Sequence, residues 1–117
     1  MTGRLSYLAG FHAEEQVAQA YRDSGRPVVA RRWRGTLGEI DVIAREGDRV
    51  VFIEVKKSRT HDMAAQHLTP WQMQRIWHTA EEYLCNEPAG LNTDVRIDVA
   101  LVDSMGRIAI VENAYAA

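Results

Sequence analysis

The chain of 117 residues has a single cysteine, Cys85, only two lysines, Lys56 and Lys57, and no long apolar run. One cysteine excludes a disulfide within the chain and fits a reducing compartment. No apolar run approaches the roughly 18 residues that a transmembrane helix needs. The N-terminus has no cationic start followed by an apolar stretch, so no signal peptide is expected. These absences predict a cytoplasmic protein with no membrane partner.

The composition is typical of a globular protein, with hydrophobic residues at 46% and charged residues at 26%. The length predicts one domain, residues 1–117, and no internal repeat or low-complexity segment interrupts it. A formal net charge of −2 means that the whole molecule is not a basic nucleic-acid binder. Five arginines nevertheless crowd one stretch: Arg22, Arg26, Arg31, Arg32 and Arg34. Such a strip suits phosphate binding and equally a solvated surface, so both readings stay open.

Two runs rich in Val, Ile and Phe, residues 38–43 and 50–57, predict strands that organise the chain. Residues 45–49, which include glycine and charged side chains, supply the turn of a β-hairpin between them. If this hairpin closes at Gly47, Asp41 lies opposite Glu54.

By the same count Glu39 lies opposite Lys56, and directly opposed side chains point to the same side with Cβ atoms roughly 4.5–5.5 Å apart. The facing carboxylates of Asp41 and Glu54 repel each other, which costs stability unless a cation lies between them. Mg²⁺ binds carboxylate oxygens and keeps several waters, so the pair predicts a magnesium site. A lysine one step along the same face would orient a water there, which is the chemistry of metal-assisted phosphodiester hydrolysis.

The runs Gly-Glu-Ile-Asp-Val-Ile at residues 38–43 and Val-Phe-Ile-Glu-Val-Lys at residues 51–56 resemble the YraN-like family of small uncharacterised bacterial proteins. Those proteins in turn resemble the PD-(D/E)XK nucleases, the superfamily of restriction endonucleases and archaeal Holliday-junction resolvases. The superfamily pattern of an Asp, a spacer and then Glu-x-Lys falls on Asp41, Glu54 and Lys56. The resemblance covers residues 10–102, nearly the whole chain.

The patterns along the chain predict an α/β fold of order α-β-β-β-α-β-β. The expected elements are residues 6–24, 28–33, 38–43, 50–57, 69–86, 95–102 and 107–111. Helices on both sides of a mixed central sheet would bury residues 50–55 on both faces, and the crossover through the second helix predicts parallel third and fourth strands. The resemblance implies the same arrangement, a restriction-endonuclease-like core.

The expected first helix has an apolar face formed by Tyr7, Phe11, Val17, Ala18 and Tyr21. Glu14 lies in the middle of that face, where a carboxylate needs a partner. The family has a Gly-x-x-Gly-Glu pattern at this point, which residues 10–14 match except for Ala13 in place of the second glycine. The resemblance implies that Glu14 reaches the metal directly or through water. The alternative is an ion pair of Glu14 with Arg32 or Lys56.

The segment between the hairpin and the second helix, residues 58–68, is polar and lacks a period, so it is predicted to be a mobile loop. Its histidines and aspartate suggest zinc, but their loose spacing favours a solvated loop. Thr69 and Gln72 predict a capping box at the start of the second helix, with Pro70 at its first position. The family usually has a lysine at the position of Gln72. The three tryptophans are assigned to the core, with an interface as the alternative: Trp33, Trp71 and Trp77.

The resemblance implies a metal-dependent endonuclease acting on DNA, with structured or branched DNA suggested by analogy with the resolvases. Asp41, Glu54 and the Val55 carbonyl would bind Mg²⁺ or Mn²⁺, and Lys56 would position or deprotonate the attacking water. Glu39 would hold Lys56 in place. The residues expected to contact nucleic acid are Arg31, Arg32, Arg34, Lys57, Arg59 and Arg75. A nuclease that cuts both strands usually acts as a dimer, so a homodimer is expected.

Two other hypotheses stay open at this point. The first is a non-catalytic nucleic-acid-binding module on the same fold, for which the missing lysine at Gln72 and the modest overall charge leave room. The second is a structural reading in which Asp41, Glu54 and Lys56 form a salt-bridge network within the sheet. Divalent-metal binding separates the enzyme from both alternatives, since neither requires a metal ion.

Overall fold

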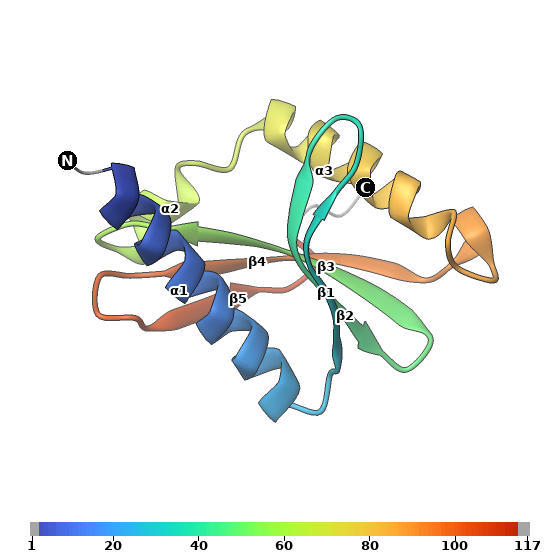
Figure 1. The fold of residues 1–117 in the computed structure, drawn as a ribbon, viewed down its shortest axis with the longest axis horizontal. Coiled ribbons are helices and arrows are strands. Elements are labelled where there is room, and N and C mark those ends of the chain that lie inside the picture. Colours follow the sequence, from blue (N-terminus) through green and yellow to red (C-terminus); the bar gives the residue numbers. More distant parts are fainter. Residues whose placement is uncertain (1–2, 115–117) are drawn as a thin grey trace.

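The described residues form a five-stranded mixed sheet with helices on both faces (Figure 1). The computed structural model describes residues 3–114, with side chains from residue 10 onward. Its elements, in chain order, are α1 (Gly3–Asp23), β1 (Val28–Arg34), β2 (Glu39–Glu46), β3 (Arg49–Lys57), α2 (His61–Ala65), α3 (Pro70–Leu84), the 3₁₀ turn η1 (Gly90–Asn92), β4 (Val95–Val102) and β5 (Ile108–Val111). The predicted α/β class and the order α-β-β-β-α-β-β are confirmed, with α2 and η1 as additions.

The strands lie side by side in their order along the chain, from β1 to β5. Three of the four neighbouring pairs are antiparallel, and β3 pairs with β4 in parallel. Parallel neighbours need a long connection, which α2 and α3 supply between β3 and β4. The predicted parallel pairing of the third and fourth strands is therefore confirmed.

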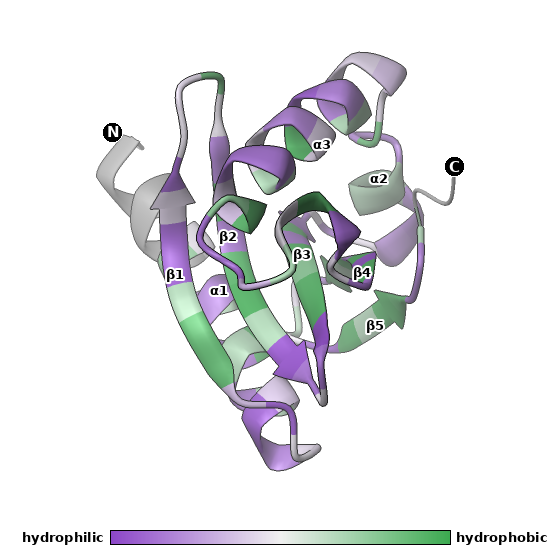
Figure 2. Cartoon of the chain, turned by 90° about the vertical axis from the view of Figure 1, so that its right-hand side faces the viewer, coloured by the Kyte–Doolittle hydropathy of each residue, from purple (hydrophilic) through white to green (hydrophobic). Residues whose placement is uncertain are grey.

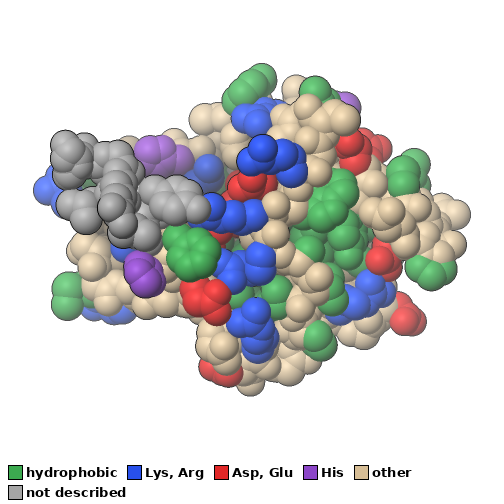
Figure 3. Space-filling view, in the orientation of Figure 1, with side chains coloured by type: hydrophobic (Ala, Val, Ile, Leu, Met, Phe, Trp, Pro, Cys, Tyr) green, Lys and Arg blue, Asp and Glu red, His purple; other side chains and the backbone are tan. Residues whose placement is uncertain are grey.

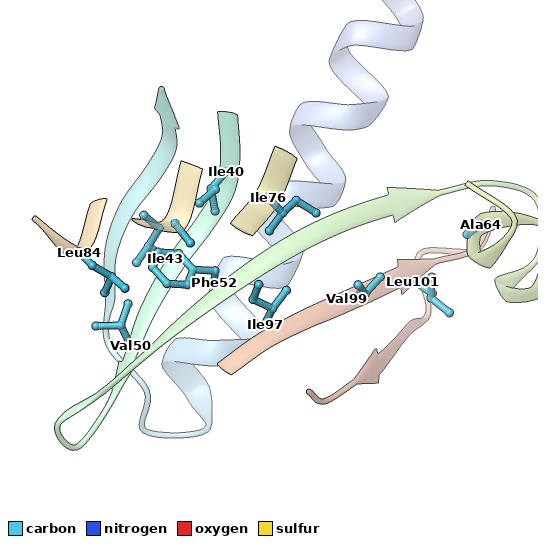
Figure 4. Packing of buried hydrophobic residues seen from close by; sticks show 11 residues of the cluster. Ile40, Ile43, Val50, Phe52, Ala64, Ile76, Leu84, Ile97, Val99 and Leu101 are labelled. Carbon is cyan, nitrogen blue, oxygen red and sulfur yellow. The ribbon is translucent and has the colours of Figure 1, made fainter. Parts of the chain in front are cut away.

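Both faces of the central strand β3 are covered, and every residue from Val50 to Ile53 is fully buried. The core on the α3 side is drawn in Figure 4, where side chains from three strands and α3 point toward one another; it includes Ile40, Ile43, Phe52, Ile76, Leu84 and Ile97. The core on the α1 side includes Val17, Tyr21, Val42, Val51, Ile53 and Val102. Figure 2 shows the matching pattern, with a hydrophobic stretch along β3 and a largely hydrophilic outer side of α3.

The helix boundaries follow the expected end signals. After α1, Gly25 adopts φ +83°, a left-handed conformation that suits glycine, and Pro27 precedes β1. At the start of α3 the Thr69 side chain accepts a hydrogen bond from the Gln72 N–H at 3.2 Å, and Pro70 takes the first helical position. No helix among residues 3–114 combines the length and the apolar character needed to cross a membrane.

The segment predicted to be a mobile loop contains a helix, α2. Thr60 caps it by accepting a hydrogen bond from the Met63 N–H at 3.1 Å, and Ala64 is fully buried against the core on the α3 side. The prediction failed because a helix of five residues is too short to show a helical period. Its stability comes from the cap and from the buried alanine.

Two further assignments to the core are wrong. Phe11 was expected on the buried face of α1, but its side chain is 40% exposed and lies beside the guanidinium groups of Arg31 and Arg32. Trp71 is exposed in the first turn of α3, whereas Trp33 and Trp77 do pack against the core. Phe11 lies in the middle of α1 and Trp71 in the first turn of α3, and the helical period that places a residue on the apolar face does not tell which turns of a helix contact the sheet. Tyr7 lies outside the residues whose side chains are described.

The sheet face under α1 contains one fully buried carboxylate, Asp98. It accepts hydrogen bonds from the Tyr21 hydroxyl at 2.7 Å, the Arg96 guanidinium at 2.8 and 3.1 Å and the Asn113 N–H at 3.0 Å. Four donors satisfy the charge, so burial of this group is compensated. The network ties α1 to β4 and to the end of the described chain.

We expect Asp98→Ala to lower the free energy of unfolding by about 3–5 kcal/mol, because it leaves the buried Tyr21 hydroxyl without its acceptor and removes two hydrogen bonds of Arg96, which keeps its ion pairs with Glu46 and Glu112. Asp94→Ala is the control, since Asp94 makes only an exposed ion pair with Arg49 and its loss costs less than about 1 kcal/mol. Urea denaturation of the two variants measures both values. Equal stability of the two variants would show that the Asp98 network is not a major contributor.

Candidate active site

Asp41 lies where β2 and β3 separate. Their antiparallel ladder begins with Glu46 opposite Arg49, which is the predicted register. The ladder ends at Val42, one residue before Asp41. There Oδ2 of Asp41 accepts a hydrogen bond from the main-chain N–H of Val55 at 2.8 Å. The side chain of Asp41 thus accepts a hydrogen bond from a main-chain N–H of β3, and this bond holds the carboxylate in place.

The alternation of side chains along β2 also breaks at Asp41. Val42 belongs to the core on the α1 side and Ile43 to the core on the α3 side. Ile40 should share a face with Val42 in a regular strand, yet it lies in the core on the α3 side. The departure from the regular pleat coincides with the hydrogen bond between Asp41 and Val55.

Glu54 is 4% exposed and projects from β3 toward α3. Its Oε2 accepts a hydrogen bond from Nε2 of Gln72, in the first turn of α3, at 3.4 Å. Its Oε1 is buried and has no hydrogen-bond partner among the described residues. A buried acceptor without a partner costs about 1–3 kcal/mol, so this oxygen marks a position that a cation, a proton or a water would stabilise.

Burial changes the proton affinity of both carboxyl groups. Burial, followed by the negative charge of Asp41, raises the pKa of Glu54 to about 8. Burial also raises the pKa of Asp41 to about 6, although the hydrogen bond from the Val55 N–H opposes this. The positive charge of Lys56 acts to lower both pKa values. Without a cation the pair therefore retains a proton near neutral pH.

The residues present fit a divalent ion bound through oxygen. The predicted ligands are the carboxylates of Asp41 and Glu54 and the carbonyl of Val55, the residue whose N–H binds Asp41. Mg²⁺ typically takes one or two carboxylates and keeps several waters. Within the part of the chain that the structure describes, no group of three or more His, Cys, Asp and Glu side chains is arranged to hold a metal. The remaining ligands would have to be water or substrate oxygens.

Lys56 follows Glu54 by two residues on β3, so the two side chains lie on the same face. Among the described residues its ammonium forms no hydrogen bond or ion pair. Glu39 was expected opposite Lys56, but the ladder between β2 and β3 does not reach it. Glu39 lies opposite Arg34 in β1 and accepts a hydrogen bond from its guanidinium at 3.2 Å. The partner of Glu39 is therefore Arg34 and not Lys56.

Glu14 is paired with an arginine. Its side chain is 13% exposed and accepts hydrogen bonds from Nε and Nη2 of Arg32 at 2.7 and 3.4 Å. This is the ion pair named above as the alternative to a metal-binding role. The negative charge of Glu14 also acts to raise the pKa of Asp41, so Glu14 lies within electrostatic reach of the site. A role for Glu14 at a metal ion stays a prediction.

Arg31 and Arg32, two of the residues expected to contact nucleic acid, are ion-paired with Glu15 and Glu14 on α1. Figure 3 shows this mixture of charges, with Lys and Arg side chains gathered in a band down the middle of one face and acidic side chains beside them. Their positive charge is therefore partly compensated within the protein.

The other four predicted contact residues fall into two groups. Arg34, Lys57 and Arg59 are exposed. Arg75 is half-buried on α3, where its Nε donates a hydrogen bond to the Leu37 carbonyl at 3.0 Å. Lys57 and Arg59 are available to a phosphate, whereas Arg34 is paired with Glu39 and Arg75 has a structural contact.

Sequence reasoning missed one neighbour of the site, Gln72. Its side chain was assigned to a capping box with Thr69, but it donates to Glu54 instead. The available signal was its place in the family pattern, where a lysine is usual. A lysine or a glutamine there can donate to the same carboxylate, so the position indicates a contact with the site.

Residues 13–102 match the uncharacterised protein family UPF0102. The chain belongs to this family. A UPF0102 protein of Cereibacter sphaeroides is 60% identical over 117 residues, which is the full length of both chains. A UPF0102 protein of Roseobacter denitrificans is 49% identical over 112 residues, covering 96% of this chain and 87% of that one. The matched segment contains Asp41, Glu54 and Lys56, so the resemblance to this family is confirmed.

Among solved structures, a repair endonuclease from Pyrococcus abyssi resembles this chain with a TM-score of 0.49 and 18% sequence identity. The similarity covers 77% of this chain and 38% of the endonuclease. This chain therefore corresponds to well under half of that protein.

The raised pKa of Glu54 predicts a pH-dependent stability in metal-free protein. Because the folded state binds this proton more tightly than the unfolded state, the free energy of unfolding should fall as the pH rises from the ordinary value of 4.5 to about 8. One such group contributes at most about 1.4 kcal/mol per pH unit. Denaturation in EDTA at a series of pH values measures the slope.

Glu54→Gln should remove much of this slope and be more stable than the wild type at pH 8. Glu46→Gln is the matched control, since Glu46 is only half-buried and forms surface ion pairs. If the wild type and Glu54→Gln show the same pH profile, burial of a charged Glu54 is not the cause.

Proposed function

We propose that this protein is a metal-dependent endonuclease that hydrolyses phosphodiester bonds in DNA. Asp41, Glu54 and the Val55 carbonyl would hold Mg²⁺ or Mn²⁺. The observation that carries the proposal is the buried Oε1 of Glu54, which has no hydrogen-bond partner among the described residues and lies within electrostatic reach of the half-buried Asp41 carboxylate. A divalent cation would satisfy that oxygen and neutralise the pair.

The pattern of residues supports a hydrolase over the purely structural alternative. In a salt-bridge network Lys56 would pair with Asp41 or Glu54, yet no ion pair of Lys56 occurs among the described residues. The Asp, Glu-x-Lys pattern of the PD-(D/E)XK nucleases is complete in Asp41, Glu54 and Lys56. The observed order of strands and helices is also the order that this resemblance implies.

A bound divalent ion would supply stabilisation for the charge that develops on the phosphate. The chain would prepare the site through fixed contacts, since the Val55 N–H orients Asp41 and the Gln72 amide orients Glu54. The unpaired ammonium of Lys56 would position the attacking water or offset charge at the scissile phosphate. Glu14 would act on Asp41 through its charge, with Arg32 as its direct partner.

The substrate in this proposal is DNA, with structured or branched DNA as the preferred form and a homodimer as the working assembly. Exposed Arg34 and Arg59 would contact phosphates, and Lys57, on the opposite face of β3, would contact DNA only away from the scissile phosphate. The second candidate function is a non-catalytic nucleic-acid-binding module. Gln72 favours it, because a neutral amide stands where the family usually has a lysine that could bind phosphate.

Metal binding is tested first. We expect Mn²⁺ to bind at one site in calorimetry and Glu54→Ala to abolish this binding. Glu46→Ala, on the neighbouring strand and outside the ligand set, should bind Mn²⁺ as the wild type does. Equal affinity of the wild type and Glu54→Ala would argue against the site.

Cleavage is tested with single-stranded, duplex, flap and four-way DNA, in Mg²⁺ and in Mn²⁺ separately. Lys56→Ala should keep metal binding, since an ammonium has no lone pair to donate, and should lose about 10²–10⁴-fold in cleavage rate. Lys57→Ala is the matched control, because alternation sends Lys57 to the opposite face of β3.

Two results would contradict the role of Lys56. One is equal cleavage by Lys56→Ala and Lys57→Ala. The other is loss of folding in Lys56→Ala alone, which the melting temperatures of both variants would reveal. A wild type that binds DNA and Mn²⁺ but cleaves none of the substrates would support the non-catalytic alternative.

A further inference from the structure

A large aromatic side chain, Trp71, is exposed to solvent in the first turn of α3. It is 65% exposed, although tryptophan is usually well buried in proteins. The Arg75 guanidinium lies over its ring, 4.8 Å from the centroid. A ring has two faces, so a second planar group can stack on the open side, where the adjacent guanidinium also favours negative charge.

A concave surface adjoins this ring. A cavity of about 250 Å³ is lined by Leu37, Trp71, Gln74, Arg75 and His78. Its volume lies below the roughly 300–1,000 Å³ of pockets for drug-sized ligands, so it suits a single planar ring system. None of its lining residues is acidic.

The loop between β1 and β2 builds one wall of this cavity and is held firmly on α3. The Arg75 Nε donates to the Leu37 carbonyl at 3.0 Å. The Glu82 carboxylate accepts hydrogen bonds from the Thr36 N–H at 3.0 and 3.1 Å and from the Thr36 hydroxyl at 3.0 Å. A Cβ at Gly35 would lie 2.7 Å from Oε1 of Glu82, so the absence of a side chain there permits the close approach. The wall therefore exists before any ligand binds.

The same surface continues to the candidate active site. Arg75 also lines a neighbouring cavity together with Glu39 and Gln72. The Gln72 side chain donates to Glu54, and Gln72 directly follows Trp71 in the chain. A strand of nucleic acid whose phosphate lies at Asp41 and Glu54 would thus pass close to Trp71.

We propose that Trp71 and Arg75 form a stacking platform for an unpaired nucleobase of the nucleic acid held at the site. The inference rests on the proposed function for its ligand, DNA, and adds the class of DNA that fits. Bases within a closed duplex are stacked on each other and cannot reach an aromatic ring beside the backbone. The platform therefore selects single-stranded, flap or junction DNA, and it tolerates any base because every base has a π-face.

The test measures DNA binding in EDTA, so that neither cleavage nor metal binding enters the result. The probes are a short fluorescein-labelled oligothymidylate and a fully paired duplex of the same length, followed by fluorescence anisotropy with the full chain. Trp71→Ala should weaken binding of the single strand by about 5- to 100-fold, the range of base–aromatic stacking. Duplex affinity should change less than about twofold.

Two matched variants separate stacking from general effects. Trp71→Phe keeps an aromatic face and should retain most of the single-strand affinity. Leu91→Ala removes an apolar side chain of similar exposure, 67%, from η1 and should change neither affinity. Melting temperatures verify that each variant folds, which an exposed position on α3 allows.

Three outcomes would overturn the inference. If Trp71→Ala binds the single strand as the wild type does, the platform is wrong while the metal site of the proposed function stands. If single-strand and duplex affinity fall together and sedimentation shows a dimer becoming a monomer, Trp71 belongs to an interface between copies of the chain. If the wild type binds neither DNA, the inference fails, and the Mn²⁺ titration separately decides whether the metal site exists.

Discussion

Repulsion between a buried and a half-buried carboxylate is the constraint around which the candidate site is built, because desolvation penalises the charge of both Glu54 and Asp41. Oδ2 of Asp41 accepts a hydrogen bond from the Val55 N–H and Oε2 of Glu54 a long one from Gln72, but the buried Oε1 of Glu54 has no partner among the described residues. A fold that needed only stability would replace such a pair by apolar residues. Its presence is the reason for proposing a metal ion at this position.

The carboxylate of Asp98 shows how the same chain treats a buried charge with a structural role. Four donors surround Asp98, including two from Arg96, and no oxygen is left without a partner. Glu54 lies in the same sheet and is nearly as deeply buried, yet its Oε1 has no hydrogen-bond partner in the described part of the chain. This difference between Asp98 and Glu54 distinguishes a carboxylate satisfied within the fold from the one at the candidate site.

The N-terminus of α3 connects the two proposals. Its first turn places Gln72 against Glu54 and exposes the preceding residue, Trp71, to solvent. The loop between β1 and β2 is fastened to the same helix by Arg75 and Glu82. A nucleic acid strand bound at the carboxylates would meet a rigid surface, because the elements that form it are already joined by hydrogen bonds.

The sequence by itself determined the order of elements and the hairpin register from Glu46 back to Val42, because strand alternation and a turn at Gly47 are local properties. Only the tertiary structure decided the contacts made across elements. These include the ion pair of Glu39 with Arg34, where Lys56 was expected, the ion pair of Glu14 with Arg32 and the exposure of Trp71. Each contact depends on how the elements pack, for example on the break in side-chain alternation of β2 at Asp41. No local period in the sequence encodes such packing.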